Sequence, residues 1–408
     1  MTDSETFVIV GAGHAGGRAA EAMRMLGFGG EIILVGAEPH LPYERPPLSK
    51  ELLQTEGGEG FTLIRDQAYY DENRIDCRLG SRATAIDRGA KSVTLQDGAT
   101  LSYDKLLLTT GGDVRRLDLP GADLSNVFYL RTLDDSRAIE SRLGGAPRVV
   151  IVGGGFIGLE VAASARRRGG AVTVLEAADR LMGRAVLPEI SQAFLDLHGD
   201  HGVDIRLGCA IGHFEGAGTV ERAITGDGET LPADLVVIGV GIVPDTALAE
   251  DAGLAVDDGL VVDEFCRTSD PAIFAAGDVT RHFSPLCGRP IRLESWQNAQ
   301  NQAIAAAKIM CGEETPFSEV PWMWSDQFDA NLQIAGMPES WDAVLFRGDV
   351  AARDFIGFQM QDGEVVGAMS LNRPRDMRFA RRLIGAGRRI DAGALTDEAV
   401  PLRDLAKG

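Results

Sequence analysis

Two glycine-rich turns stand out because their spacing suits the binding of a dinucleotide. The first is Gly11-Ala12-Gly13-His14-Ala15-Gly16, and Glu38 follows its last glycine by 22 residues; the second is Gly153-Gly154-Gly155-Phe156-Ile157-Gly158, and Glu176 follows by 18. In a G-x-G-x-x-G turn, the first glycine permits a tight turn, the second lets the backbone approach a pyrophosphate, and the third packs helix against strand. A carboxylate about 20 residues further on accepts hydrogen bonds from ribose hydroxyls. The sequence therefore predicts two dinucleotide sites.

Each turn is expected to join a buried strand to a helix. The apolar runs 6–10 and 148–152 predict strands, and the alanine-rich stretches after both turns predict helices. A second strand is expected at 31–35 and at 171–175, just before each acid. Further buried strands are expected within 104–112, 233–241 and 270–278. These are two βαβ units, so the predicted fold class is α/β with two Rossmann-like dinucleotide-binding domains.

The pattern changes after Pro316. Aromatic residues cluster in PWMWSDQF at 321–328, where Trp322 and Trp324 are spaced to share one face of a strand. Alternating apolar residues around Asp362-Gly363 predict a hairpin, and an arginine-rich helical stretch follows. We expect a third, α+β domain from about residue 318.

Composition excludes several classes of protein. The 408 residues carry 40 Lys and Arg against 60 Asp and Glu, a formal net charge of −20, which repels a nucleic-acid backbone. Cysteines stand at 77, 209, 266, 287 and 311 without metal, cluster or dithiol spacing, so we expect no metal, no iron–sulfur cluster and a reducing cytoplasm. Only five residues precede the first strand and no long apolar run exists, so neither a leader nor a membrane span is expected.

Two dinucleotide sites in one chain indicate a tightly held flavin dinucleotide and an exchanging nicotinamide dinucleotide. The arrangement resembles the FAD- and NAD(P)-dependent pyridine-nucleotide oxidoreductases, of the glutathione reductase-like fold, in which the first site holds FAD. Gly277-Asp278 resembles the family's second FAD motif, whose Asp binds the ribityl chain. The segments 104–111 and 237–245 resemble the crossings between the FAD and NAD domains.

A narrower resemblance comes from motifs along the whole chain. YERPPLSKELL, GGGFIGLE, RTSDPAIFAAGDV, ESWQNAQNQ and PWMWSDQF together resemble the NADH-dependent ferredoxin reductases of bacterial Rieske oxygenases and class I cytochrome P450 systems. Disulfide reductases of the superfamily carry a C-x-x-x-x-C pair beside the flavin, whereas this chain has no Cys before Cys77. The resemblance implies that hydride passes from NADH to FAD and that single electrons pass on to a [2Fe–2S] ferredoxin.

The resemblance also implies which residues contact the two cofactors. For FAD these are Gly11, Gly13, His14, Ala15, Gly16, Glu38, Arg45, Lys50, Thr110, Gly111, Gly277, Asp278, Ser295, Trp296, Ala299 and Trp324. For NAD they are Gly153, Gly155, Phe156, Ile157, Gly158, Glu160, Glu176 and Gly241. Lys50 and Glu160 would form the catalytic pair at the hydride-transfer point; the alternative is a surface lysine and a glutamate placed by the helix dipole. The implied domains are FAD-binding at 1–112 and 243–317, NAD-binding at 113–242, and a C-terminal acceptor domain at 318–408.

Three features have more than one interpretation. Glu176 favours NADH over NADPH because it would repel a 2′-phosphate, although Arg180 and Arg184 lie nearby in the sequence. His198 and His201 flank Gly199-Asp200, which favours a solvated loop over a metal site. The stretch 373–389 holds seven Arg and one Asp, so it is either a docking surface for an acidic ferredoxin, testable at Arg381, Arg382, Arg388 and Arg389, or a helix paired with acidic neighbours.

Other functions stay open at this point. The chain could reduce rubredoxin or a small acceptor such as a quinone, or it could be a redox-sensing flavoprotein whose interactions change when NADH binds. The first alternative predicts efficient NADH oxidation with a small acceptor and little dependence on a protein acceptor, whereas a sensor turns over slowly with every acceptor.

Overall fold

The computed structural model describes residues 4–57 and 62–407 and divides the chain into two compact units. Among these residues, the first unit contains 4–45, 62–113 and 243–321. The second contains 46–57, 114–242 and 322–407. The segment 46–57, which lies in the first predicted FAD-binding stretch, thus groups with the second unit.

The first unit is built on a parallel sheet of five strands in the order β19-β7-β1-β2-β3. The strands are β1 (Thr6–Val10), β2 (Glu31–Val35), β3 (Ile75–Arg78), β7 (Lys105–Leu108) and β19 (Ile273–Ala275). The other elements of this unit are α1 (His14–Met25), α3 (Gln67–Glu72), β4 (Ala83–Asp87), β5 (Ser92–Leu95), β6 (Thr100–Ser102), α7 (Ala247–Asp251), β18 (Leu260–Val262), β20 (Thr280–Ser284), β21 (Arg289–Ile291) and α8 (Trp296–Met310).

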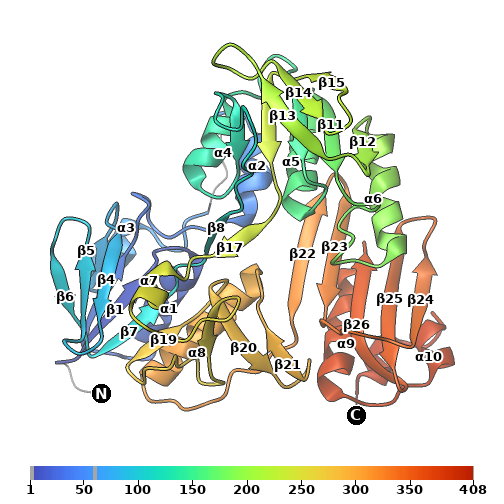
Figure 1. The fold of residues 1–408 in the computed structure, drawn as a ribbon. Helices are drawn as coiled ribbons and strands as arrows, with labels where there is room; N and C mark the ends of the chain where they lie inside the picture. The colour runs from blue at the N-terminus through green and yellow to red at the C-terminus, as the bar shows by residue number, and fades with distance from the viewer. Residues whose placement is uncertain (1–3, 58–61, 408) are drawn as a thin grey trace. The chain divides into compact units, whose positions relative to one another are not determined.

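Both faces of this sheet are buried, which explains the continuous apolar runs in its strands. Phe7 and Ile9 point toward α1 and α8, which pack against each other (Figure 1). Val8 and Val10 point to the opposite face and share a core with residues of the small sheet β4-β5-β6. Since β2 and β7 lie on opposite sides of β1, the chain reverses its winding at the carboxyl end of β1, where ligands bind in such sheets.

The second unit repeats this plan with the parallel order β12-β11-β10-β16-β9. Its strands are β9 (Val127–Tyr129), β10 (Arg148–Val152), β11 (Ala171–Glu176), β12 (Asp204–Leu207) and β16 (Leu235–Ile238). The flanking elements are a 3₁₀ turn (Pro46–Ser49), α2 (Glu51–Gln54), α4 (Leu133–Glu140), α5 (Phe156–Arg167), α6 (Pro188–Asp200), β13 (Ile211–Glu215), β14 (Arg222–Thr225) and β15 (Thr230–Pro232). The chain crosses between the units within β8 (Gly112–Val114) and β17 (Ile242–Pro244).

The same unit also holds an antiparallel sheet whose strands run in the order β22-β23-β26-β25-β24 (Figure 1). These are β22 (Trp322–Gln327), β23 (Ala330–Ala335), β24 (Ala343–Asp349), β25 (Asp354–Gln361) and β26 (Glu364–Leu371), followed by α9 (Pro374–Ala386), α10 (Ala392–Thr396) and α11 (Leu402–Leu405). The predicted hairpin is confirmed: β25 and β26 pair across Asp362-Gly363, and both turn residues have positive φ. Leu332 and Phe355 of this sheet share one hydrophobic core with α5 and α6.

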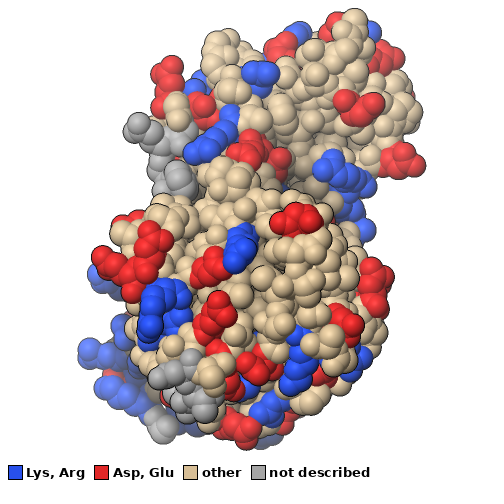
Figure 2. Space-filling model, turned by 90° about the vertical axis from the view of Figure 1, so that its left-hand side faces the viewer, with Lys and Arg blue, Asp and Glu red and all other residues tan. Residues whose placement is uncertain are grey.

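The structure therefore confirms the α/β fold class with two Rossmann-like domains and a C-terminal α+β domain. Among the described residues, no helix combines the length and apolarity that crossing a bilayer requires. Asp and Glu side chains are scattered over one face of the molecule with Lys and Arg between them, so the net negative charge is not gathered in a single patch there (Figure 2).

Candidate functional sites

The two glycine turns have the same geometry. A Cβ on Gly11 would overlap the carbonyl oxygen of Thr109, and a Cβ on Gly153 would overlap that of Gly239. Both glycines also have positive φ, +114° and +107°. The third glycine of each turn packs just as tightly, since a Cβ on Gly16 or Gly158 would overlap the carbonyl oxygen of the first glycine.

The second glycine of each turn is different, because it faces open space. Among the described residues, no heavy atom lies within 4 Å of the position of a Cβ on Gly155, and the nearest to one on Gly13 is Arg45 Nη2 at 3.7 Å. These glycines are also the N-caps of α1 and α5, and neither helix start receives a side-chain cap from a described residue. Backbone N–H groups therefore point outward at both helix starts, the arrangement that binds phosphate. We call each glycine turn with the helix start that follows it a cradle: residues 11–16 with α1, and residues 153–158 with α5. Both cradles fit a dinucleotide.

In the first unit, three segments far apart in sequence converge on the start of α1. Gly277 has φ +86°, and a Cβ there would lie 3.3 Å from that of Ala15 and within 4 Å of Ala299 on α8. Ser295 caps α8 by accepting from the Asn298 N–H at 3.2 Å. The ring of Trp296, at the start of α8, lies 5.1 Å from that of His14. The structure thus brings five predicted FAD contacts together: His14, Ala15, Gly277, Trp296 and Ala299.

His14 is the clearest sign of an additional group at this place. It is buried, and neither ring nitrogen has a partner among the described residues. Burial lowers the pKa of His14 to about 3, and Arg18 and Arg45 add to this effect, so the ring is neutral near pH 7. Buried polar atoms are normally hydrogen-bonded. An orphaned imidazole beside a phosphate cradle therefore fits a bound polar ligand such as FAD.

Glu38 and Arg45, both predicted FAD contacts, form an ion pair with each other at 2.9 Å. Tyr43 Oη donates to Glu38 Oε2 at 2.5 Å, and the guanidinium of Arg45 lies over the Tyr43 ring. Burial alone would lower the pKa of Arg45, but Tyr43, Glu38 and Asp278 together raise it. Tyr43 was not predicted, although it stands two residues from Arg45 in the same motif.

Gln302, which is not among the predicted contacts, fixes the turn that carries Asp278. Its side-chain oxygen accepts from the Gly277 N–H at 2.9 Å, from Thr280 Oγ1 at 2.8 Å and from Asn298 Nδ2 at 3.3 Å. Gln302 is fully buried.

Thr110, at the crossing after β7, donates to the Asp245 carbonyl at 2.7 Å, and Gly111 has positive φ.

In the second unit, Glu176 lies at the end of β11 with both carboxylate oxygens in use. One accepts from the Gly154 N–H and the other from the Ala178 N–H, each at 2.7 Å. A carboxylate has about four acceptor positions, so two remain for ribose hydroxyls. Of the other predicted NAD contacts, Phe156, Ile157 and Gly158 form the first turn of α5, and Gly241 has positive φ.

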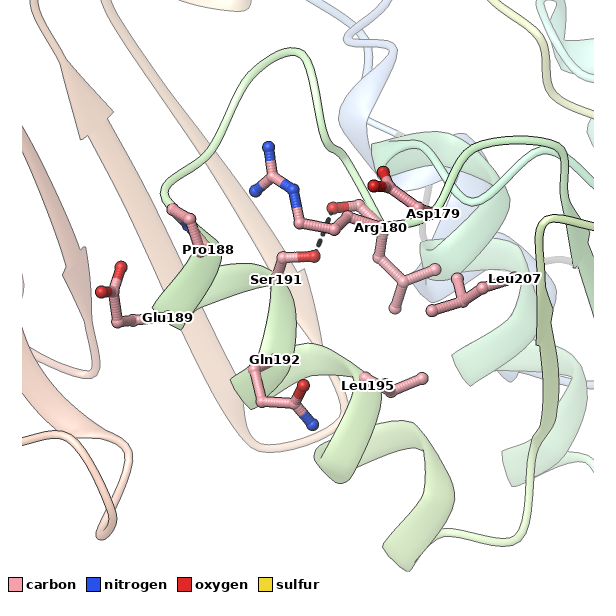
Figure 3. Close-up of a pocket in the computed structure, with 9 residues that line it drawn as sticks. Asp179, Arg180, Pro188, Glu189, Ser191, Gln192, Leu195 and Leu207 are labelled. Carbon is pink, nitrogen blue, oxygen red and sulfur yellow. Dashed lines mark hydrogen bonds between the residues drawn. The ribbon is translucent and has the colours of Figure 1, made fainter.

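A cavity of about 340 Å³ lies just beyond β11, between the following loop and α6 (Figure 3). Asp179, Glu189, Gln192 and Leu207 are among the residues that line it. Ser191 Oγ donates to the Leu181 carbonyl at 2.8 Å and ties α6 to this loop. Arg180 donates to the carbonyls of Gly183 and Val186, so it braces its own loop instead of projecting as a solvated charge.

Lys50 and Glu160 form a buried ion pair, with Lys50 Nζ 3.0 Å from Glu160 Oε2. Lys50 is 9% exposed and Glu160 is 4% exposed, so a surface lysine is not what the structure shows. Lys50 Nζ also donates to the Pro46 carbonyl at 3.3 Å, and Ser49 Oγ donates to Glu160 Oε2 at 2.5 Å. Trp324, the last predicted FAD contact, lies on β22 in the same unit, and its ring stacks on Trp322.

The predicted solvated loop was wrong for His198, whereas His201 is exposed in the turn that follows α6. His198 belongs to α6, which continues through Gly199 to Asp200, and its side chain is fully buried. Its Nε2 lies 2.9 Å from Gln327 Oε1. Among the described residues, no group of three metal-binding side chains surrounds either histidine.

The burial of His198 predicts a pH-dependent stability. Burial lowers the pKa of His198 from 6.5 to about 4, although the hydrogen bond to Gln327 acts to raise it. Below pH 6.5 the unfolded chain binds a proton that the folded chain does not, so stability falls with falling pH. From pH 7 to about pH 5.2, we expect His198 to contribute a loss of about 1.5 kcal/mol in the free energy of unfolding.

Urea unfolding of wild type and His198→Met at both pH values measures this contribution. The stability difference between the two proteins should shrink by that amount at the lower pH, which is still above the pI of about 4.7. Leu197→Ala, a buried neighbour on α6, serves as a destabilised control whose difference from wild type should not change with pH. An unchanged difference for His198→Met would contradict the assignment.

Comparison with known proteins agrees with this geometry. The family described as pyridine nucleotide-disulphide oxidoreductase matches residues 5–303, and the reductase C-terminal family matches residues 322–406. The chain is 46% identical to the ferredoxin–NAD(+) reductase component of an anthranilate 1,2-dioxygenase system from Burkholderia cepacia, over 98% of this chain and 99% of that protein.

Two solved structures are similar over nearly the whole chain. The putidaredoxin reductase of a covalent complex with putidaredoxin has a TM-score of 0.95 and 38% identity, covering 99% of this chain and 98% of that one. The ferredoxin reductase for the CYP199A2 system from Rhodopseudomonas palustris also has a TM-score of 0.95, with 39% identity, covering 99% of this chain and all of that one. With its two dinucleotide cradles and its reductase-type C-terminal domain, the chain belongs to the pyridine nucleotide-disulphide oxidoreductase family.

Proposed function

We propose that this protein is an NADH:ferredoxin oxidoreductase that supplies electrons to an oxygenase. The observation that carries the proposal is the pair of matching dinucleotide cradles in a chain that is 46% identical to the reductase component of a dioxygenase system over its full length. The terminal oxygenase would be a Rieske oxygenase or a cytochrome P450, as in the family that the sequence resembles. We also propose that it works in the cytoplasm, which suits its five unpaired cysteines.

FAD in the first cradle and NADH in the second would supply the chemistry, namely hydride acceptance followed by release of single electrons. The residues of the protein would bind and orient the two cofactors. The N–H groups at the starts of α1 and α5 would hold the pyrophosphates, and Glu38 and Glu176 would accept from ribose hydroxyls. Arg45 places a positive charge beside the first cradle, where it would balance pyrophosphate charge. The Lys50–Glu160 pair would orient the nicotinamide.

The state of the cysteines supports direct transfer from flavin to a protein acceptor. Burial raises the pKa of Cys266 to about 12 and the pKa of Cys77 and Cys311 to about 11, and it also raises the pKa of Cys209. These thiols stay protonated near pH 7, and a protonated thiol is a poor nucleophile. Four of the five thiols are therefore poorly suited to a dithiol relay of the kind that disulfide reductases use.

The loop after β11 supports NADH as the electron donor. Glu176 and Asp179 place two carboxylates there, which would repel the 2′-phosphate of NADPH. Arg180 is held by carbonyl groups of its own loop. Arg184, the second arginine of this stretch, is exposed.

Anaerobic NADH oxidation by the FAD-loaded protein, with and without a [2Fe–2S] ferredoxin, tests the proposal. The expected result is a rate that rises and saturates with ferredoxin concentration, together with bleaching of the ferredoxin. If NADH reduces the flavin fully but ferredoxin stays oxidised, the function is instead reduction of a small acceptor or redox sensing. Failure of NADH to reduce the flavin would overturn the proposal at its first step.

A further inference from the structure

Three hydrogen bonds from described residues reach Glu160, and one of them comes from the C-terminal sheet. Ser49 Oγ and Lys50 Nζ donate to Oε2, as described above. Ser325 Oγ, on β22, donates to Oε1 at 2.6 Å. Ser325 is fully buried, so water does not compete for this contact. A hydrogen bond to a charged group in such surroundings is among the stronger ones in proteins.

The contact to Ser325 is the end of a longer buried chain of hydrogen bonds. Gln327 Nε2 donates to Ser325 Oγ at 3.1 Å, and Gln327 Oε1 lies 2.9 Å from His198 Nε2. Because an amide oxygen only accepts, His198 carries its proton on Nε2 and is the donor. Every donor in the sequence His198, Gln327, Ser325 therefore points toward the Glu160 carboxylate. Hydrogen bonds aligned in one direction polarise and strengthen one another.

Strand alternation explains how β22 contributes two side chains to this series of hydrogen bonds. Ser325 and Gln327 are two residues apart and lie on the same face, which turns toward α5 and α6. Trp322 and Trp324 lie on the other face, where the guanidinium of Arg381 on α9 covers Trp322 at 5.2 Å. One strand thus carries an aromatic surface on one side and the support of Glu160 on the other.

Among the described residues, the Lys50 ammonium group has one donor left once these contacts are counted. Its ammonium group has three N–H bonds; one is directed to Glu160 and one to the Pro46 carbonyl. The direction of the third is set by the other two. Any movement of the Glu160 carboxylate would therefore also change the direction of this third N–H of Lys50.

We propose that Ser325 and Gln327, with His198 behind them, are positioning residues that hold Glu160, and through it Lys50, in the orientation needed for hydride transfer from NADH. This inference rests on the proposed function. It gives the C-terminal domain a role in the reductive half-reaction, in addition to any contact with the electron acceptor.

Ser325→Ala and Gln327→Met interrupt the chain of hydrogen bonds at two points with little change in side-chain volume. In single-turnover reduction of the flavin by NADH, each is expected to lower the limiting rate about tenfold, which corresponds to about 1.4 kcal/mol, with little change in the NADH dissociation constant. Ser370→Ala is the matched control, because Ser370 is a fully buried serine on β26 of the same sheet whose hydroxyl has no partner among the described residues.

Infrared spectroscopy gives a second readout that does not depend on turnover. The carboxylate bands of Glu160, identified by their loss in Glu160→Gln, should shift in Ser325→Ala and Gln327→Met but not in Ser370→Ala. Wild-type rates and unshifted bands in both variants would overturn the inference and leave the proposed function intact. If the wild type itself is not reduced by NADH, the proposed function fails instead.

Discussion

Replacing Lys50 by methionine is expected to slow reduction of the flavin by NADH by about 10²–10³-fold. The substitution removes the positive charge next to Glu160 and leaves a buried carboxylate supported by two hydroxyl donors. Breaking a buried ion pair costs about 3–5 kcal/mol, so the protein should also become less stable. Stopped-flow absorbance gives the rate constant, and urea unfolding gives the change in stability.

The double variant Lys50→Met/Glu160→Gln separates catalysis from folding. It removes both charges, so no unpaired buried charge remains and most of the lost stability should return. The reduction rate should stay low, because the group that we propose orients the nicotinamide is still missing. A double variant that recovers the wild-type rate would show that the pair has only a structural role.

The local geometry of both dinucleotide cradles could be predicted from the sequence because glycine chemistry determines it. At Gly11 and Gly153, the positive φ and the neighbouring carbonyl exclude any side chain, so the residue type directly reports the backbone conformation. The strand β1 begins and ends at the predicted residues, 6 and 10. The helix α1 begins at His14, within the glycine turn and ahead of the alanine-rich stretch that predicted it.

Contacts between distant segments could not be predicted in the same way. Gly199-Asp200 suggested a loop at His198, yet Leu197 and Phe194 bury this part of α6 and the helix continues past the glycine. The partner of His198, Gln327, is 129 residues away in the sequence. The alternation in PWMWSDQF predicted that Trp322 and Trp324 share a face, but it could not show that Ser325 on the other face contacts Glu160.

The arginine-rich stretch divides into structural and exposed residues, so the pairing with acidic neighbours that one interpretation expected holds for part of it. Arg373 is paired with Asp354 and Glu398, Arg388 donates to the Leu405 carbonyl, and Arg381 covers Trp322. Exposed arginines on α9 are Arg375, Arg378 and Arg382. Spacings of three and four residues put them on one face of the helix, while Met377, Ala380 and Leu383 face the core.

Reversing the charge at Arg375, Arg378 and Arg382 together is expected to raise the ferredoxin KM by at least about tenfold at low salt. In a protein of net charge −20, this row of guanidinium groups would attract a small acidic ferredoxin locally. Three glutamates in their place would repel it. The salt dependence separates this mechanism from a general loss of activity: kcat/KM should fall with added salt in the wild type and stay flat or rise in the variant.

A triple reversal at Arg74, Arg82 and Lys308 is the matched control, since all three are exposed basic residues of the first unit and the net charge changes by the same amount. Its ferredoxin KM should stay near the wild-type value, and flavin reduction by NADH should be normal in both variants because neither triple includes a cradle residue. If both triples raise the KM equally, the ferredoxin senses only the overall charge of the reductase. If neither triple raises the KM, the acceptor docks elsewhere and the exposed face of α9 is solvated. If only the α9 triple raises the KM, the docking surface lies on the helix that covers Trp322.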